Sequence, residues 1–347
     1  MTVQAATNGP SPRFGLGVPT GTEGLMYPVP YADVDEAVHL ACEAERLGFD
    51  SVWGNDHVST QQYVRAEYDD PPRFFDPLTY LAFVAARTTR IRLATAILVM
   101  GFRNPVTVAK EAATIDHLSG GRFILGLGIG AYREEYEAMW PDRSIDRGSQ
   151  AAEYIEALQL LFSQRRASFD GEYIRFTDIE SYPKPLQDPL PILSGGNSSG
   201  ARRRAALLAN GWLPACLTPG EYRNGLAEIR RTAEANGRTL DGFEPALQLV
   251  VAIGDTDEAA AARFRDSQVH AHLTSLGGST MRGRLQDLTV RNLVGKPDEV
   301  AARVEEYVDA GVATFAGLLF AADTVAETLE QMERFTGGVM ARFSNGR

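Results

Sequence analysis

The sequence has few cysteines and no long apolar run, and each shortage excludes a class of protein. Two cysteines among 347 residues, Cys42 and Cys216, cannot form a disulfide scaffold, which predicts a reducing, cytoplasmic location. No apolar run approaches the ~18 residues that span a bilayer, and the first dozen residues lack the features of a secretory signal. We therefore expect neither a membrane segment nor export.

Basic residues and histidines are also scarce. There are 34 Lys and Arg against 45 Asp and Glu, a formal net charge of −11, which argues against nucleic acid as a partner. Of the five histidines, His39 and His117 fall within predicted helices, whereas His270 and His272 are too close in sequence to share a helix face. No cysteines or carboxylates accompany them at ligand spacing, so no metal site is predicted.

What the sequence does contain is a regular alternation of short β-rich runs and helical stretches. Eight such units in strict order predict a parallel sheet closed into a (β/α)8 barrel, the TIM-barrel form of the α/β class. The predicted strands are 14–18, 51–53, 91–99, 123–129, 191–193, 211–215, 247–253 and 314–320. The predicted helices are 33–47, 77–88, 106–118, 147–162, 199–208, 221–235, 257–273 and 325–335, with a further helix at 297–310.

Two insertions interrupt this alternation. Residues 163–190 contain Asp170-Gly171, a turn signal that predicts a small β-hairpin after the fourth helix. Residues 274–296 hold four glycines and no strong period, which indicates a lid-like insertion before the 297–310 helix. No linker marks a second domain, so we expect a flexible tail at 1–12, one barrel domain at 13–338 and a C-terminal tail at 339–347.

Function in such a barrel resides in the loops that follow the strands, and the loop after the second strand carries Asp56-His57. A histidine there can donate a hydrogen bond or shuttle a proton near neutral pH. The alternative is that His57 only caps a loop. Cys216 ends the sixth predicted strand, where we expect a small buried thiol.

The loop after the fifth predicted strand reads Ser194-Gly195-Gly196-Asn197-Ser198 and leads into a helix. Glycines let a ligand approach the backbone, and free N–H groups at a helix start attract phosphate. Arg202 lies in the first turns of that helix and adds positive charge. The alternative is a plain strand–helix turn with solvated arginines.

A second glycine-rich run, 126–131, matches the dinucleotide-binding pattern G-x-G-x-x-A. That fingerprint opens a first βαβ unit, whereas here three units precede it and a long polar loop follows it. We therefore do not expect a Rossmann dehydrogenase.

Ordered motifs over about residues 13–335 resemble the luciferase-like monooxygenase family, whose fold is a (β/α)8 barrel. The motifs that carry this resemblance are residues 47–53 with Asp56-His57, 103–106, 118–123 leading into 126–130, 134–137, 182–185, 194–196, 210–212 and 294–300.

The resemblance implies a cofactor, either the deazaflavin coenzyme F420 or reduced FMN, at the carboxyl end of the barrel. Asp56 and His57 would then lie beside the ring, and Ala96-Ile97 falls where many deazaflavin members have a non-prolyl cis peptide bulge behind it. By the same comparison, Gly128, Ile129 and Gly130 would pass the ring or its phosphate chain, and Ser194, Gly195 and Gly196 would bind phosphate. His57 is the implied proton-transfer residue, with Glu134 as a second candidate.

The Asp-His pair looks more like the F420-dependent branch, which implies hydride transfer to or from a small organic substrate. The sugar-phosphate dehydrogenases of that branch have Trp and Glu where this sequence has Gln61 and Ala131, which argues against glucose 6-phosphate. Two alternatives stay open: an FMNH2-dependent monooxygenase supplied by a partner reductase, and a non-catalytic flavin-binding barrel. A homodimer is usual in the family. Aromatic residues that could line an apolar pocket are Tyr27, Trp53, Tyr63, Phe102 and Trp140.

Overall fold

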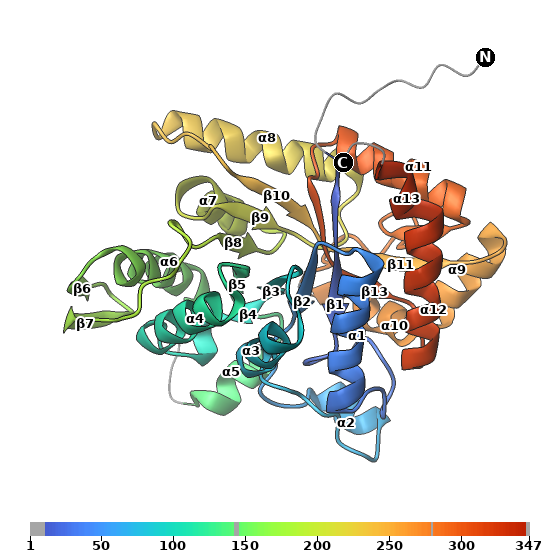
Figure 1. Cartoon of the computed structure of the whole chain (residues 1–347), viewed down its shortest axis with the longest axis horizontal. Coiled ribbons are helices and arrows are strands. Elements are labelled where there is room, and N and C mark those ends of the chain that lie inside the picture. Colours follow the sequence, from blue (N-terminus) through green and yellow to red (C-terminus); the bar gives the residue numbers. More distant parts are fainter. Residues whose placement is uncertain (1–10, 142–145, 279, 345–347) are drawn as a thin grey trace.

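In the computed structural model, which describes residues 11–141, 146–278 and 280–344, parallel strands close into a barrel (Figure 1). The order around it is β1-β2-β3-β5-β8-β9-β10-β13, and β13 pairs again with β1, so the described strands form the predicted (β/α)8 barrel. Its strands are β1 (Arg13–Val18), β2 (Ser51–Gly54), β3 (Arg92–Thr95), β5 (Phe123–Gly128), β8 (Ile192–Gly195), β9 (Gly211–Leu213), β10 (Glu244–Leu247) and β13 (Thr314–Phe320). Shorter strands are β4 (Leu98–Val99), β11 (Val250–Ile253) and β12 (Leu293–Gly295).

Helices cover the outside of this barrel, and their ends follow local sequence signals. Asp33 caps the first helix through a capping box with Glu36, and Gly48 ends it in the left-handed conformation, at φ 86°. The helices are α1 (Val34–Leu47), α2 (Gln62–Glu67), α3 (Pro77–Arg87), α4 (Pro105–Ser119), α5 (Arg133–Met139), α6 (Arg147–Ser163), α7 (Ser199–Leu207), α8 (Pro219–Ala235), α9 (Asp257–Asp266), α10 (Gln268–Ser275), α11 (Pro297–Asp309) and α12 (Val325–Phe335).

Three of the sequence-based elements need correction. The polar stretch after the fourth predicted strand is not all loop, because it contains α5, and α2 is a further helix that the periodicity missed. The predicted helix 257–273 is two helices, since Ser267 adopts an extended conformation (φ −79°, ψ 152°) that separates α9 from α10. The predicted strand 247–253 is likewise divided between β10 and β11.

The predicted strand 91–99 is divided at Ala96-Ile97, where the peptide bond is cis. The segment before it pairs with β2 and β5 as β3, and the segment after it pairs with β5 as β4. The bulge implied by the family resemblance is therefore confirmed, and it places Ile97 at the carboxyl end of the barrel.

The insertions differ in their relation to the barrel. The predicted hairpin is present as β6 (Ala167–Asp170) and β7 (Arg175–Ile179), a separate two-stranded sheet at the far left of Figure 1, away from the barrel centre. In the 274–296 insertion, buried Leu276 and Met281 pack onto the barrel, and β12 pairs with β11. Beyond residue 338, Val339 and Met340 are buried and helical structure continues to Phe343, so the predicted C-terminal tail begins inside a packed segment. The predicted N-terminal tail lies mostly outside the described residues.

The barrel interior is filled by one side chain from most strands. The largest of these side chains is that of Trp53 in β2. A Cβ at Gly15 of the neighbouring β1 would lie only 2.3 Å from its indole nitrogen. The tryptophan is thus core and does not line a pocket. The other members of this cluster are Ala94, Ala96, Ile124, Leu193, Leu213, Ala246 and Ala316.

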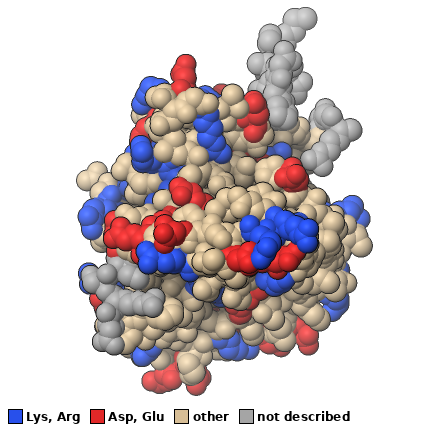
Figure 2. Space-filling view, turned by 90° about the vertical axis from the view of Figure 1, so that its left-hand side faces the viewer, with Lys and Arg blue, Asp and Glu red and all other residues tan. Residues whose placement is uncertain are grey.

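Charges of both signs are interspersed on the face that Figure 2 presents, with broad uncharged areas between them. Among the described residues, no helix has the length and apolar character needed to span a membrane.

Candidate functional site

A cavity of about 200 Å³ opens at the carboxyl ends of the barrel strands. Its walls come from loops far apart in the sequence, including the segments after β2, β5, β8 and β9 and the 274–296 insertion. The predicted site residues that line it are Asp56, His57, Ala96, Ile97, Gly128, Ile129, Gly130, Gly195 and Gly196.

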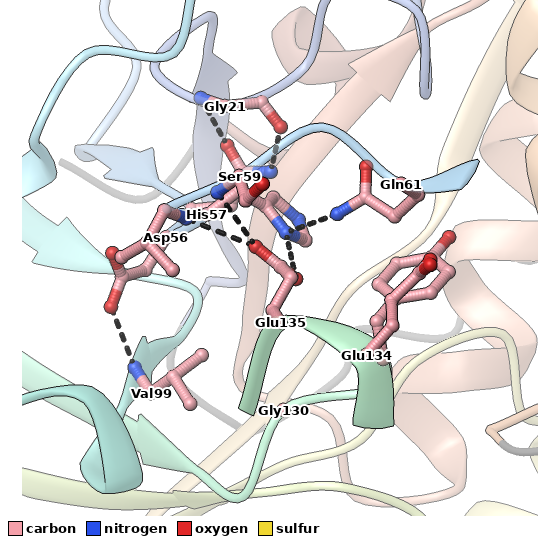
Figure 3. Close-up of polar contacts among 12 residues, drawn as sticks. Gly21, Asp56, His57, Ser59, Gln61, Val99, Gly130, Glu134 and Glu135 are labelled. Carbon is pink, nitrogen blue, oxygen red and sulfur yellow. Dashed lines mark hydrogen bonds and ion pairs between the residues drawn. The ribbon is translucent and has the colours of Figure 1, made fainter. Parts of the chain in front are cut away.

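His57 is held in this cavity by a carboxylate from another loop. Its Nδ1 lies 2.9 Å from Oε2 of Glu135, whose other oxygen accepts hydrogen bonds from the backbone N–H groups of Val58 (3.0 Å) and Ser59 (3.3 Å) (Figure 3). A carboxylate can only accept, so Nδ1 carries a proton and donates it. In the neutral ring Nε2 then keeps its lone pair, and no hydrogen bond to Nε2 is made by the described residues. The arrangement orients an imidazole whose second nitrogen is available to a bound molecule.

Glu135 is ionised in this setting although it is almost fully buried. Burial raises the pKa of the carboxyl group, but the hydrogen bond from His57, the positive charge of the His57 ring when it is protonated, and the two backbone donors outweigh it, so the net shift of the Glu135 pKa is downward. Gln61 completes the contacts, with its amide nitrogen 3.1 Å from the same Nδ1 and its Oε1 buried without a partner among the described residues. Turning the amide by 180° would let that oxygen share the Nδ1 proton with Glu135.

The structure places Glu135, and not the predicted Glu134, against His57. Glu134, the candidate named from the sequence, is not part of the cavity wall and accepts a hydrogen bond from the N–H of Gln62 at 3.2 Å. Because neighbouring helix residues project about 100° apart, α5 turns only one of the two adjacent glutamates toward His57. That residue is Glu135, which the sequence reasoning missed.

Asp56 precedes His57 in the chain, and only one of its two carboxylate oxygens has hydrogen-bond partners among the described residues. Its Oδ2 accepts from the guanidinium of Arg103 and from the N–H of Val99 (2.9 Å), whereas Oδ1 is buried and has no hydrogen-bond partner among the described residues. Burial raises the pKa of this carboxyl group, and Arg103 opposes that rise. A buried carboxylate oxygen without a partner costs free energy unless a ligand donor reaches it.

The Ile97 side chain packs against two strands, β5 and β8, at positions occupied by glycine. A Cβ at Gly128 would lie 2.6 Å from Ile97 Cδ1, and a Cβ at Gly195 would lie 2.5 Å from Ile97 Cγ2 and 3.0 Å from the carbonyl oxygen of Leu127. These glycines are therefore required by the bulge itself. Ala96 and Ile97 of the bulge in turn give the cavity an apolar floor.

Two residues predicted to bind phosphate lie outside the wall. Ser194 is buried and its hydroxyl donates to the carbonyl oxygen of Ala201 at 2.9 Å, and Arg202 pairs with Glu228 at 2.7 Å. Gly196, at φ 115°, does line the cavity just before α7. Arg147, which the sequence reasoning did not select, places Nη1 3.2 Å from the carbonyl oxygen of Gly130.

Three uncharged polar side chains meet between the loop after β5, α2 and α10. The hydroxyl groups of Tyr63 and Tyr132 lie 3.1 Å apart, and each is within 3.3 Å of Nδ1 of His272. Complete burial lowers the pKa of His272 to about 3, so the ring is neutral. Tyr132 and His272 both line the cavity. Their contact joins the loop after β5 to α10, so the spacing of residues along one helix could not predict it.

The remaining aromatic candidates do not line the cavity. Tyr27 stacks on Tyr31 with ring centroids 4.0 Å apart, Phe102 packs in a buried cluster, and the Trp140 indole donates to the carbonyl oxygen of Gly101 at 2.9 Å. Cys216 does reach the cavity wall as a buried thiol, and burial raises its pKa to about 12.

Comparisons with known proteins agree with this geometry. The family model described as luciferase-like monooxygenase matches residues 13–314. An F420-dependent glucose-6-phosphate dehydrogenase of Kineococcus radiotolerans is 31% identical over 300 residues, covering 81% of this chain and 85% of the relative. Among solved structures, monooxygenase RslO1 from Streptomyces bottropensis superposes with a TM-score of 0.77 at 21% identity, covering 96% of this chain and 100% of that one. An F420-dependent secondary alcohol dehydrogenase gives 0.75 at 18% identity, covering 95% and 99%. The chain belongs to the luciferase-like monooxygenase family.

Proposed function

We propose that this protein is an oxidoreductase that uses coenzyme F420 for hydride transfer to or from a small organic substrate. The observation that carries the proposal is the His57–Glu135 pair in a cavity floored by the Ala96-Ile97 bulge, because it joins a proton-transfer group to an apolar surface suited to a ring. The relative from Kineococcus radiotolerans, named for F420 dependence, supports the choice of cofactor.

The residues present fit such a cofactor. Gly128 and Gly195 leave room for the Ile97 side chain at the floor of the cavity, and Oδ1 of Asp56 is a buried acceptor without a partner among the described residues. Backbone N–H groups near Gly196 and the guanidinium of Arg147 are suited to a phosphate. When bound, F420 supplies the hydride chemistry, because C5 of its deazaflavin ring accepts or donates a hydride.

The task left to the chain is to handle the proton that accompanies the hydride. In the direction of oxidation, Nε2 of His57 takes the proton of a substrate hydroxyl group, and in the reverse direction it returns that proton. Glu135 holds the ring orientation through Nδ1 and stabilises the positive charge that Nε2 gains. Burial of Glu135 keeps water from replacing it in this contact.

Binding and turnover test the proposal together. The purified protein is titrated with F420 and with FMN while ring fluorescence is followed, and His57→Ala is assayed with the better ligand. We expect F420 to bind in the micromolar range and the variant to lose turnover while retaining binding. Binding of FMN alone would support the two-component monooxygenase, which needs a partner reductase. Binding of neither would support a barrel without catalytic function.

The homodimer and the cytoplasmic location predicted from the sequence belong to this proposal as well. Size-exclusion chromatography with light scattering and cell fractionation are the measurements that check them.

A further inference from the structure

The half of the cavity that faces away from the glycine loops is apolar. It is walled by side chains from the first loop, β13, α10 and the segment that follows α10. The residues of this apolar wall are Met26, Leu249, Val250, Leu273, Leu276, Met281 and Leu319.

The charged side chains of the cavity lining also restrict which substrates can bind. In the part of the lining that the structure describes there is no Lys or Arg, and the two carboxylates, Asp56 and Glu135, are held by contacts with Arg103 and His57. Arg103 also binds Asp76, so its charge is shared between two carboxylates. Moving a phosphate dianion into such a wall leaves it without a cationic partner, which is strongly unfavourable.

The polar side chains beside the apolar wall, Tyr132 and His272, are neutral. Nδ1 of His272 is 3.2 Å from the hydroxyl of Tyr132, and the Tyr132 ring centroid lies 5.8 Å from that of His57. A tyrosine hydroxyl and a neutral imidazole can exchange hydrogen bonds with a hydroxyl or carbonyl group but give no charge compensation to an anion.

We propose that the substrate is an uncharged, mainly apolar molecule with one hydroxyl or carbonyl group, which Tyr132 and His272 bind while the apolar wall covers the rest. The inference rests on the proposed function and names its substrate class. It separates this chain from the sugar phosphate that names its Kineococcus relative.

The test measures ligand binding to the F420-loaded protein by saturation-transfer NMR, and turnover by F420 fluorescence. The probes are cyclohexanol, 2-butanol and 1-phenylethanol against glucose 6-phosphate. We expect at least one alcohol to bind and to be oxidised, with two electrons and one proton leaving as hydride to F420 and the second proton passing to His57. Glucose 6-phosphate is expected to bind at least about tenfold more weakly than that alcohol, because its charge has no partner.

Two variants make the result specific. Met281→Arg places a cation in the apolar wall and is expected to lower alcohol binding by about tenfold or more. Leu285→Arg, an exposed position in the same segment, is the matched control and should leave binding unchanged. Because Met281 is buried, Tyr132→Phe serves as a second variant, expected to lower alcohol affinity by about tenfold through loss of one hydroxyl.

The outcomes separate the two proposals. Glucose 6-phosphate binding more tightly than all three alcohols, or no binding of any alcohol to F420-loaded protein, overturns the substrate class and leaves the F420 function standing. Failure of F420 itself to bind overturns the proposed function and with it this inference.

Discussion

Glu135→Gln is the substitution that probes the candidate site most sharply, since it removes one charge and changes almost no volume. In the native protein Oε1 accepts from Val58 and Ser59, and Oε2 accepts from Nδ1 of His57. A glutamine has a single oxygen. If that oxygen keeps the two backbone donors, its NH2 group faces Nδ1, which must then become an acceptor, and the ring proton moves to Nε2.

The expected loss of activity follows from these contacts. The charge-assisted hydrogen bond contributes about 1.5–3 kcal/mol, which corresponds to about 10- to 150-fold in rate when it stabilises charge on the imidazole. Full reversal of the tautomer sets an upper limit of about 10⁴-fold, the size of that effect in serine proteases. We therefore expect kcat/KM to fall between about tenfold and 10⁴-fold, with the Kd for F420 changed little.

The assay follows F420 fluorescence under steady-state conditions, and ¹⁵N NMR of labelled histidine at alkaline pH reports which ring nitrogen is protonated. His57→Ala assigns the signal. Glu134→Gln is the matched control, because it makes the same change one residue earlier on α5, where the carboxylate faces Gln62 outside the cavity. Equal losses in the two glutamine variants, or an unchanged tautomer with unchanged turnover in Glu135→Gln, would refute the reasoning.

Three further predictions concern the packing and ionisation around the site. Because the fold lowers the pKa of Glu135 below its ordinary 4.5, its ionised carboxylate contributes fully to stability above about pH 4.5, and this contribution is lost as the pH falls through the folded-state pKa. The free energy of unfolding, measured with denaturant at a series of pH values, should therefore fall less steeply below pH 4.5 in Glu135→Gln than in the native protein. Gly195→Ala places a Cβ 2.5 Å from Ile97 Cγ2 and should cost about 1–3 kcal/mol of unfolding free energy, of which Ile97→Ala in the same chain should restore a part; equal stability of the single variant and the native protein would contradict this. With a thiol reagent, Cys42 should react in the folded protein, whereas buried Cys216, whose pKa is raised to about 12, should react only after unfolding.

The fold was largely predictable because its signals are local. Alternating β-rich and helical periods, Asp33 at a helix start and Gly48 at its end depend on residues within a few positions of one another. The misses occurred where tertiary contacts outweighed such signals. The short helix α5 has charged residues along most of its length, yet it is held against the loop after β2 by Glu135.

The position of the site was also within reach of the sequence, since strand ends of a barrel share one face. In that way the sequence reasoning selected Asp56, His57 and the glycine loops, which line the cavity, and the family resemblance located the bulge at Ala96-Ile97. His272 was set aside because its spacing from His270 did not fit a shared helix face. Its place in the cavity could not be predicted, since its partners Tyr63 and Tyr132 lie on other elements.

The sequence by itself determined the barrel, its insertions and the loop that carries His57, because helix and strand periods and turn residues act over short distances. Only the tertiary structure decided which of two adjacent glutamates orients that histidine, and that Arg202 is engaged by Glu228 and does not reach the cavity. It also brought Tyr132 and His272 into contact at the cavity wall. The physical reason is that a hydrogen bond or ion pair requires atoms about 3 Å apart, and for residues distant in sequence that distance is fixed by the packing of whole elements.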